Sequence, residues 1–395
     1  MKRQPKIVAM VQLPPPMHGA ARMNQHAIEA LARQFDVLVL EMNFTRDLSD
    51  LDRPSLRKLT RALWLLLRLV GALPRAKALY ICFAPTGGAY IRDCLYVLIA
   101  KMFRVPAVLH LHGRGLPAMR QSRLALAFQK TVFANQSVIQ LGENLRSEIA
   151  GLACHATIIS NCLEPNAITD PARGDWHPSK PLKLLWLSNL FRAKGIETLI
   201  AACQILRERG INFELTIAGA EGDISARQLR DLLEHYGIMD TAIYIGSVEG
   251  KGKANAFSNA DLFVFPSHYA NEAQPLVVLE AMAAGVPVIT SDIATLPEFV
   301  REGQTGFLCP PQNPTALAET IIRAIEYPDE TSRMRNAAYE LCKAHFNQDR
   351  FTVQITSLMS EVIGSDVQNR SQSLSSDMKR APTTQIKSGD RPNGS

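Results

Sequence analysis

The chain has 395 residues, of which 47% are apolar, and a formal net charge of +6. This length and apolar content predict two or three domains with full hydrophobic cores. No run of eighteen apolar residues appears and no signal-peptide core follows the N-terminus, so we expect a cytoplasmic protein without a membrane-spanning segment. The seven cysteines form no C-x-x-C pair and no zinc spacing, a pattern typical of buried, reduced thiols.

The positive charge lies entirely in the first half of the chain. Residues 1–175 contain 22 Lys and Arg against 12 Asp and Glu, a net charge of +10, which leaves −4 for the remainder. A basic lobe indicates an anionic partner, either a phosphorylated substrate or a membrane surface. The aromatic interleaving of single-strand nucleic-acid binders is missing, so we expect no nucleic-acid partner.

Apolar runs of strand length alternate with helical patterns along the chain. The first series of expected strands lies near 6–13, 36–42, 78–84, 106–112, 137–141 and 156–160, and the second near 182–188, 213–219, 243–246, 262–266, 286–290 and 306–309. Continuous apolar strands predict sheets buried on both faces. The alternation with helices predicts an α/β fold of two doubly wound, parallel sheets, with ligands beyond the carboxyl ends of the strands. The polar, Pro-rich stretch 164–181 is interpreted as the linker between them, and ligands commonly bind in such an interdomain cleft.

Residues 53–77 carry seven basic side chains and no acid, with leucines and Trp64 among them. One interpretation is a domain helix whose apolar stripe packs on the sheet while its charges face water. The other is contact with an anionic membrane surface, because basic amphipathic helices with tryptophan suit the interface. Just before this segment, Asp50 and Asp52 copy a metal-binding D-x-D, but no strand precedes them and we interpret them as helix-capping residues. We therefore expect no metal site.

The most informative segment is 271–292, in which Glu272 and Glu280 are separated by seven residues. Pro275 lies where a helix would begin, and Gly285 supplies a left-handed stop after a run of small residues. Glu272 would then precede a helix N-terminus while Glu280 lies on the helix itself. Exposed N–H groups and the helix dipole between them favour an anion, so the pair suits a ligand with both hydroxyls and phosphates.

This segment resembles the E-x7-E signature of retaining glycosyltransferases of family 4, which have the GT-B fold and use nucleotide-sugar donors. The resemblance extends to the loop 187–199 with Lys194, to 213–220, 259–267 and 303–308, and more loosely to 14–19 and 110–113. It implies two Rossmann-like domains facing across a cleft: an acceptor-binding domain at 1–170 and a nucleotide-sugar-binding domain at 171–345. A helix at 346–364 would return to the first domain. The polar tail 365–395 is predicted to be disordered, since it cannot bury enough apolar surface.

The resemblance also implies roles for individual residues. Lys194 would grip the donor diphosphate, Glu280 would accept the ribose hydroxyls, and Glu272 and His112 would lie near the donor sugar. The family arginine five residues before the lysine is replaced here by Asn189; either Arg192 supplies this charge or the phosphate is held with one cation fewer. The implied catalytic residues are His112, Lys194 and Glu272, and the implied donor-binding residues are Gly19, Asn189, Arg192, Lys194, Gly219, Gly246, Ser247, Glu272, Ala273, Gln274, Pro275, Leu276 and Glu280. His18, Arg22 and Arg114 are interpreted as acceptor-binding.

These expectations favour a retaining, metal-independent glycosyltransferase that moves a sugar from a nucleotide-diphosphate sugar to a glycan or lipid-linked acceptor in cell-surface polysaccharide biosynthesis. No cofactor is expected besides the donor substrate. Two alternatives stay open: a sugar-nucleotide epimerase of the same architecture, and a catalytically inactive scaffold at the membrane.

Overall fold

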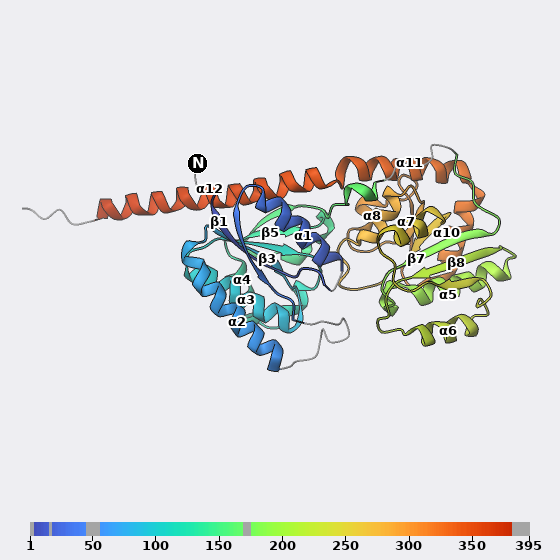
Figure 1. The fold of residues 1–395 in the computed structure, drawn as a ribbon, viewed down its shortest axis with the longest axis horizontal. Coiled ribbons are helices and arrows are strands. Elements are labelled where there is room, and N and C mark those ends of the chain that lie inside the picture. The colour runs from blue at the N-terminus through green and yellow to red at the C-terminus, as the bar shows by residue number, and fades with distance from the viewer. Residues whose placement is uncertain (1–3, 16–17, 45–55, 169–174, 381–395) are drawn as a thin grey trace, which may run out of the picture.

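The structure is a computed structural model that describes residues 4–15, 18–44, 56–168 and 175–380, with the backbone alone for Arg57 and for 365–380. Its described part holds two six-stranded parallel sheets, one in each half of the chain, which form the two lobes seen in Figure 1. All twelve expected strands are present, and their ends lie within two residues of the predicted ones. The α/β architecture predicted from the sequence is therefore confirmed.

The first sheet has the strand order β2-β1-β3-β4-β5-β6. Its strands are β1 (Lys6–Val11), β2 (Asp36–Glu41), β3 (Ala78–Phe83), β4 (Ala107–Leu111), β5 (Ser137–Gln140) and β6 (His155–Ile158). The helices of this half are α1 (Gly19–Ala32), α2 (Leu56–Ala72), α3 (Gly87–Met102) and α4 (Arg123–Phe133), with short 3₁₀ turns at η2 (Leu73–Arg75), η3 (Leu116–Met119), η4 (Glu143–Ile149) and η5 (Pro165–Ala167). Helices α2, α3 and α4 pack on one face of the sheet and α1 on the other, so each face has its own apolar core.

The second sheet has the order β12-β11-β10-β7-β8-β9. Its strands are β7 (Leu182–Leu187), β8 (Phe213–Ala218), β9 (Ala242–Tyr244), β10 (Leu262–Phe265), β11 (Val288–Ser291) and β12 (Phe307–Cys309). Between them lie η6 (Arg192–Lys194), α5 (Ile196–Glu208), α6 (Ala226–His235), α7 (Gly250–Ser258), α8 (Leu276–Ala283), α9 (Leu296–Phe299) and α10 (Pro314–Glu326), followed by α11 (Pro328–His345) and α12 (Gln348–Arg380). Two separate apolar cores flank this sheet as well.

Complete burial explains why the strands could be predicted so well. Ile7, Val8, Ala9, Met10 and Val11 of β1 are all inaccessible to solvent, as are the four residues of β10. A strand covered by helices on both faces requires apolar residues at every position, and the sequence pattern is then a continuous run. The seven cysteines are all free thiols, five of them buried. Within the described residues, no helix is long and apolar enough to cross a membrane.

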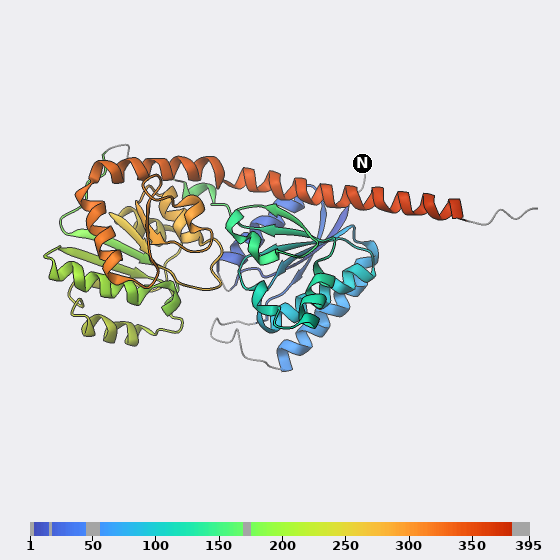
Figure 2. The same ribbon diagram turned by 180° about the vertical axis from the view of Figure 1, so that it is seen from behind.

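Helix α11 lies on the second lobe and α12 continues from it along the first, as Figures 1 and 2 show from opposite sides. Its side chains Phe351, Ile355, Leu358, Met359 and Val362 are buried in the core that α1 forms on the first sheet. The expected return of the chain to the first domain is thus confirmed.

The disorder of the tail 365–395 stays a prediction; the α12 helix of the structure runs to Arg380. Residues 381–395 lie outside the described part.

Candidate functional site

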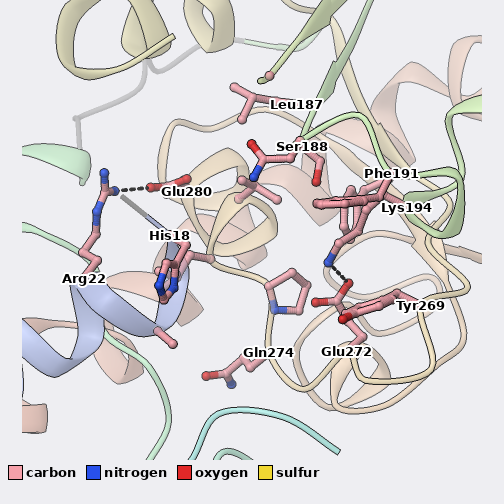
Figure 3. A pocket seen from close by; sticks show the side chains of 18 of the residues that line it. His18, Arg22, Leu187, Ser188, Phe191, Lys194, Tyr269, Glu272, Gln274 and Glu280 are labelled. Atoms are coloured by element: carbon pink, nitrogen blue, oxygen red, sulfur yellow. Dashed lines mark hydrogen bonds and ion pairs between the residues drawn. The ribbon is translucent and has the colours of Figure 1, made fainter. Parts of the chain in front are cut away.

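A cleft of about 350 Å³ lies between the two lobes, at the carboxyl ends of both sheets. This is the position expected for a ligand of two doubly wound sheets. The predicted site residues that line it are His18, Gly19, Arg22, His112, Asn189, Lys194, Gly219, Ser247, Glu272, Ala273, Gln274, Pro275, Leu276 and Glu280. Figure 3 shows His18 and Arg22 of the first domain facing Lys194, Glu272 and Glu280 of the second.

Lys194 and Glu272 form an ion pair on the second domain's side of the cleft. Nζ of Lys194 lies 2.7 Å from Oε2 of Glu272, and the two side chains are only 17% and 7% exposed. The hydroxyl of Ser267 donates to the same carboxylate oxygen at 3.1 Å, and the lysine ammonium lies 4.6 Å from the ring centre of Tyr269. Lys194 is therefore a largely buried cation with a carboxylate partner already in place (Figure 3).

The turn that carries Lys194 is fixed by a glycine. Lys194 ends η6, and Gly195 adopts φ +83° before α5 begins. A Cβ at this position would lie 2.0 Å from the carbonyl oxygen of Pro266, so only glycine fits. Gly219 at the end of β8 is constrained in the same way, because its Cβ would lie 1.7 Å from the carbonyl oxygen of Ser188. Without a Cβ at these two glycines, neighbouring backbone segments can approach each other closely beside the cleft.

Glu280 lies in α8 with its side chain 8% exposed, and it contacts two cations from different elements. Nη1 of Arg22 in α1 donates to Oε1 of Glu280 at 3.0 Å, and the ammonium of Lys253 in α7 pairs with Oε2. A buried carboxylate is costly unless it has such partners. Arg22, which was predicted to receive an anionic acceptor, thus bridges the cleft to Glu280 and also lies 3.7 Å from Glu164.

The loop between the two glutamates presents backbone to the cleft. Helix α8 begins at Leu276 with Pro275 as its N-cap, so the proline lies one position before the first helical residue rather than on it. Gly285 takes the predicted left-handed conformation with φ +68°. The side chain of Gln274 is held by the other domain, because its Oε1 accepts from the backbone N–H of Asn161 at 2.6 Å. The α8 N-terminus is therefore aimed at the cleft by contacts that cross between the domains.

His112 follows the last strand residue of β4 and lines the cleft from the first domain. Burial, and then neighbouring His18, lowers the pKa of His112 to about 3, so its imidazole is neutral at physiological pH. The ring centre of His110 lies 3.9 Å from that of His112. Nδ1 of His110 shares a 2.6 Å hydrogen bond with the hydroxyl of Tyr80. His18 caps α1, since its Nδ1 accepts from the backbone N–H of Ala21.

Three predicted residues do not contribute to the cleft lining. Arg114 forms an ion pair with Glu148, in which Nε of the arginine lies 3.6 Å from Oε1 of the glutamate. Arg192 forms an ion pair with Glu197. Neither guanidinium reaches the cleft, because each has a carboxylate partner closer by. Arg192 therefore does not replace the family arginine at Asn189 in this structure. Gly246 does not line the cleft; its carbonyl oxygen accepts a 2.8 Å hydrogen bond from the backbone N–H of Gly219.

The sequence did not indicate several lining residues, among them Asn161, Phe191, Lys253, Tyr269 and Asn271. Lys253 ends a Gly-Lys-Gly-Lys run at 250–253. A cation four residues into a helix that faces the cleft would have been a usable signal. Asp50 and Asp52 lie outside the described residues, and among those that are described no three His, Cys, Asp or Glu side chains are grouped to hold a metal ion.

Comparisons with known proteins agree with this architecture. Residues 172–341 match the model of the family described as glycosyl transferases group 1. The chain is 28% identical to the amylovoran biosynthesis glycosyltransferase AmsK of Erwinia amylovora over 221 residues, which cover 54% of this chain and 53% of that protein. It is 31% identical to the glycogen synthase of Mycobacterium tuberculosis over 267 residues, which cover 64% and 62%. The chain thus spans about half to three fifths of the length of these curated relatives.

Among solved structures, Anabaena HepE in complex with UDP-glucose superimposes with a TM-score of 0.67 and 20% identity, covering 90% of this chain and 99% of that one. At this identity the likeness concerns the fold, which is the two-domain GT-B arrangement. Together with the family model, it supports the group 1 glycosyltransferase superfamily.

Proposed function

We propose that the chain is a retaining glycosyltransferase that moves a sugar from a nucleotide-diphosphate sugar to a glycan or lipid-linked acceptor in cell-surface polysaccharide biosynthesis. The observation that carries the proposal is the pairing of Lys194 with Glu272 and of Glu280 with Lys253 and Arg22, on either side of the α8 N-terminus. Cations and N–H groups suit a diphosphate, and carboxylates suit hydroxyls. AmsK, named for amylovoran biosynthesis, and HepE, solved with UDP-glucose, support the reaction class and the kind of donor.

In the proposed reaction the acceptor hydroxyl attacks the anomeric carbon from the face that the diphosphate leaves. The new C–O bond forms as the bond from that carbon to the phosphate oxygen breaks, and the acceptor proton passes to the departing diphosphate. Lys194 and the α8 N–H groups would stabilise the developing negative charge without a metal ion. Glu280 would orient the ribose, which fixes the position of the anomeric carbon.

The neutral imidazole of His112 suits a role beside the donor sugar. A group that is uncharged at physiological pH can donate one hydrogen bond to a hydroxyl without repelling the ammonium of Lys194. The carboxylate of Glu272 lies on the other side of the same cleft, so the sugar would be held between them.

The test is a transfer assay with purified full-length chain, labelled UDP-, GDP- and ADP-sugars, and a membrane lipid extract as acceptor. A thermal-shift screen first selects the nucleotide, since a ligand at about 100 times its Kd raises stability by about 2.7 kcal/mol. Transfer from at least one donor, lost in Glu280→Gln, is the expected result. Absence of transfer from every donor would contradict the proposal.

The two alternatives give different results in the same assay. An epimerase would incorporate deuterium from heavy water into the nucleotide sugar without any acceptor, because it exchanges a proton on the sugar. An inactive scaffold would show no thermal shift with any nucleotide diphosphate. The proposal also includes contact of residues 53–77 with an anionic membrane surface, on the cytoplasmic side where nucleotide sugars are present.

A further inference from the structure

Helix α2 has two apolar faces, and only one of them is used inside the protein. Leu65 and Leu69 are fully buried against the first sheet. On the opposite side Leu56, Leu59, Leu63 and Leu67 are 83%, 67%, 56% and 64% exposed, and their spacing of three and four residues places them on one stripe. The sequence left open whether this helix turns charges or apolar side chains outward; the structure turns the leucines outward.

The neighbouring helix continues this surface. Helices α2 and α3 pack side by side, and the hydroxyl of Tyr96 in α3 donates to the carbonyl of Ala62 in α2 at 3.1 Å. On α3, Ile91, Leu95 and Met102 are 48%, 49% and 80% exposed. Figure 1 shows both helices on the face of the first sheet that lies away from α12. We name the outward side chains of α2 and α3 the apolar face.

Four exposed leucines on α2 beside three exposed large apolar side chains on α3 indicate a partner, because soluble proteins rarely expose large contiguous apolar patches. The charge of the surrounding segment indicates which kind of partner this is. Between residues 53 and 135 the sequence has fourteen Lys and Arg and one acid, Asp93, which is fully buried. A second copy of the chain would present the same positive charge and be repelled. An anionic lipid surface would attract it.

The arrangement of the cations supports the same partner. The guanidinium groups of Arg61 and Arg68 lie 5.1 Å and 5.0 Å from the ring centre of Trp64, which is itself 45% exposed. Tryptophan beside arginine along the edge of a leucine stripe is the composition of helices that lie in the interface between headgroups and acyl chains.

We propose that the apolar face is a membrane-docking surface for an anionic bilayer, which α2 and α3 enter side-on. About 25 Å of α2, at 1.5 Å per residue, would lie in the plane of the interface. Docking would hold the first domain against the bilayer, so the acceptor would be lipid-linked rather than a soluble glycan. The docking deepens the membrane contact named in the proposed function, and the choice of acceptor rests on the proposed transferase activity.

The test is co-sedimentation of the full-length chain with vesicles of phosphatidylcholine mixed with phosphatidylglycerol, without donor or acceptor. The variant Leu59→Ser, Leu63→Ser, Leu67→Ser should bind at least about 100-fold more weakly, since each buried leucine contributes roughly tenfold. Arg61→Gln with Arg68→Gln should lose about fivefold per charge at low salt, and pure phosphatidylcholine should bind wild type poorly. The control is Met239→Ser with Ile243→Ser, which lie in the second domain and are 43% and 59% exposed; it should bind like wild type.

Three results would overturn the proposal. They are failure of the wild type to bind the anionic vesicles, equal binding by the leucine variant, and a wild-type dimer in sedimentation that the leucine variant converts to a monomer. The transferase proposal is judged separately. A leucine variant that still transfers to a soluble acceptor analogue but not to acceptor in vesicles supports both, whereas vesicle binding by a chain without transfer activity supports docking alone.

Discussion

Replacing Lys194 by alanine should cost stability as well as activity, because the structure buries its partner. After Lys194→Ala the carboxylate of Glu272, 7% exposed, would keep only the 3.1 Å hydrogen bond from Ser267. Breaking a buried ion pair from one side costs about 3–5 kcal/mol. Since the lysine is 17% exposed and the cleft admits water, we expect a smaller loss, about 2–3 kcal/mol in the free energy of unfolding. Transfer should fall by about 10²- to 10³-fold, the usual effect of removing one cation from a developing charge.

The measurement is urea denaturation of wild type, Lys194→Ala, Glu272→Gln and the double variant, together with transfer rates. Adding Glu272→Gln to Lys194→Ala should restore most of the lost stability but none of the activity, because it removes the unpaired charge and not the missing ligand. The control is Arg192→Ala, whose exposed pair with Glu197 should contribute less than about 1 kcal/mol. A Lys194→Ala protein as stable as wild type would show that the ion pair is absent in the free protein. Activity within tenfold of wild type would show that Lys194 does not bind the phosphate.

Three further predictions concern the rest of the cleft. Glu280→Gln should weaken nucleotide diphosphate binding in calorimetry by about 1.5–3 kcal/mol and more than Glu272→Gln does; equal affinity in both variants would contradict the assigned roles. EDTA should leave transfer largely intact, and complete loss that manganese or magnesium restores would direct attention to Asp50 and Asp52. Acidification should destabilise the fold through His112: its folded pKa of about 3 lies below the unfolded value near 6.5, so between these pH values the unfolded state binds the additional proton and stability falls with pH. His112→Gln should therefore lose about 2 kcal/mol less than wild type between pH 7 and pH 5 in urea denaturation, and an equal loss in both would show that His112 is not held neutral.

The fold could be predicted because its strands are buried on both faces. The run from Ile7 to Val11 and the run from Leu262 to Phe265 contain no polar residue, and such runs have few other structural solutions. The E-x7-E segment was equally informative, since a proline before a helix and a glycine after it define that helix without long-range information.

Side-chain partners could not be predicted, since they depend on which segments the topology brings together. Arg114 and Arg192 stand at suitable positions in the sequence, but Glu148 and Glu197 lie nearer to them than the cleft does. Lys253 was missed for the converse reason: α7 places it beside a glutamate 27 residues further along the chain. On α2, apolar residues occupy more than one face, and periodicity alone does not say which of them meets the sheet.

The path of α12 has a consequence for how the protein is made on the ribosome. The first sheet is complete once β6 has emerged, yet Phe351, which closes part of its core, follows about 190 residues later. At about 5–20 residues per second, roughly 10–40 s of synthesis separate the two events. During that interval the first domain carries an uncovered apolar surface beside α1, which a chaperone can occupy and which a chain truncated before α12 never covers. The domain that is synthesised first is therefore the last to be finished.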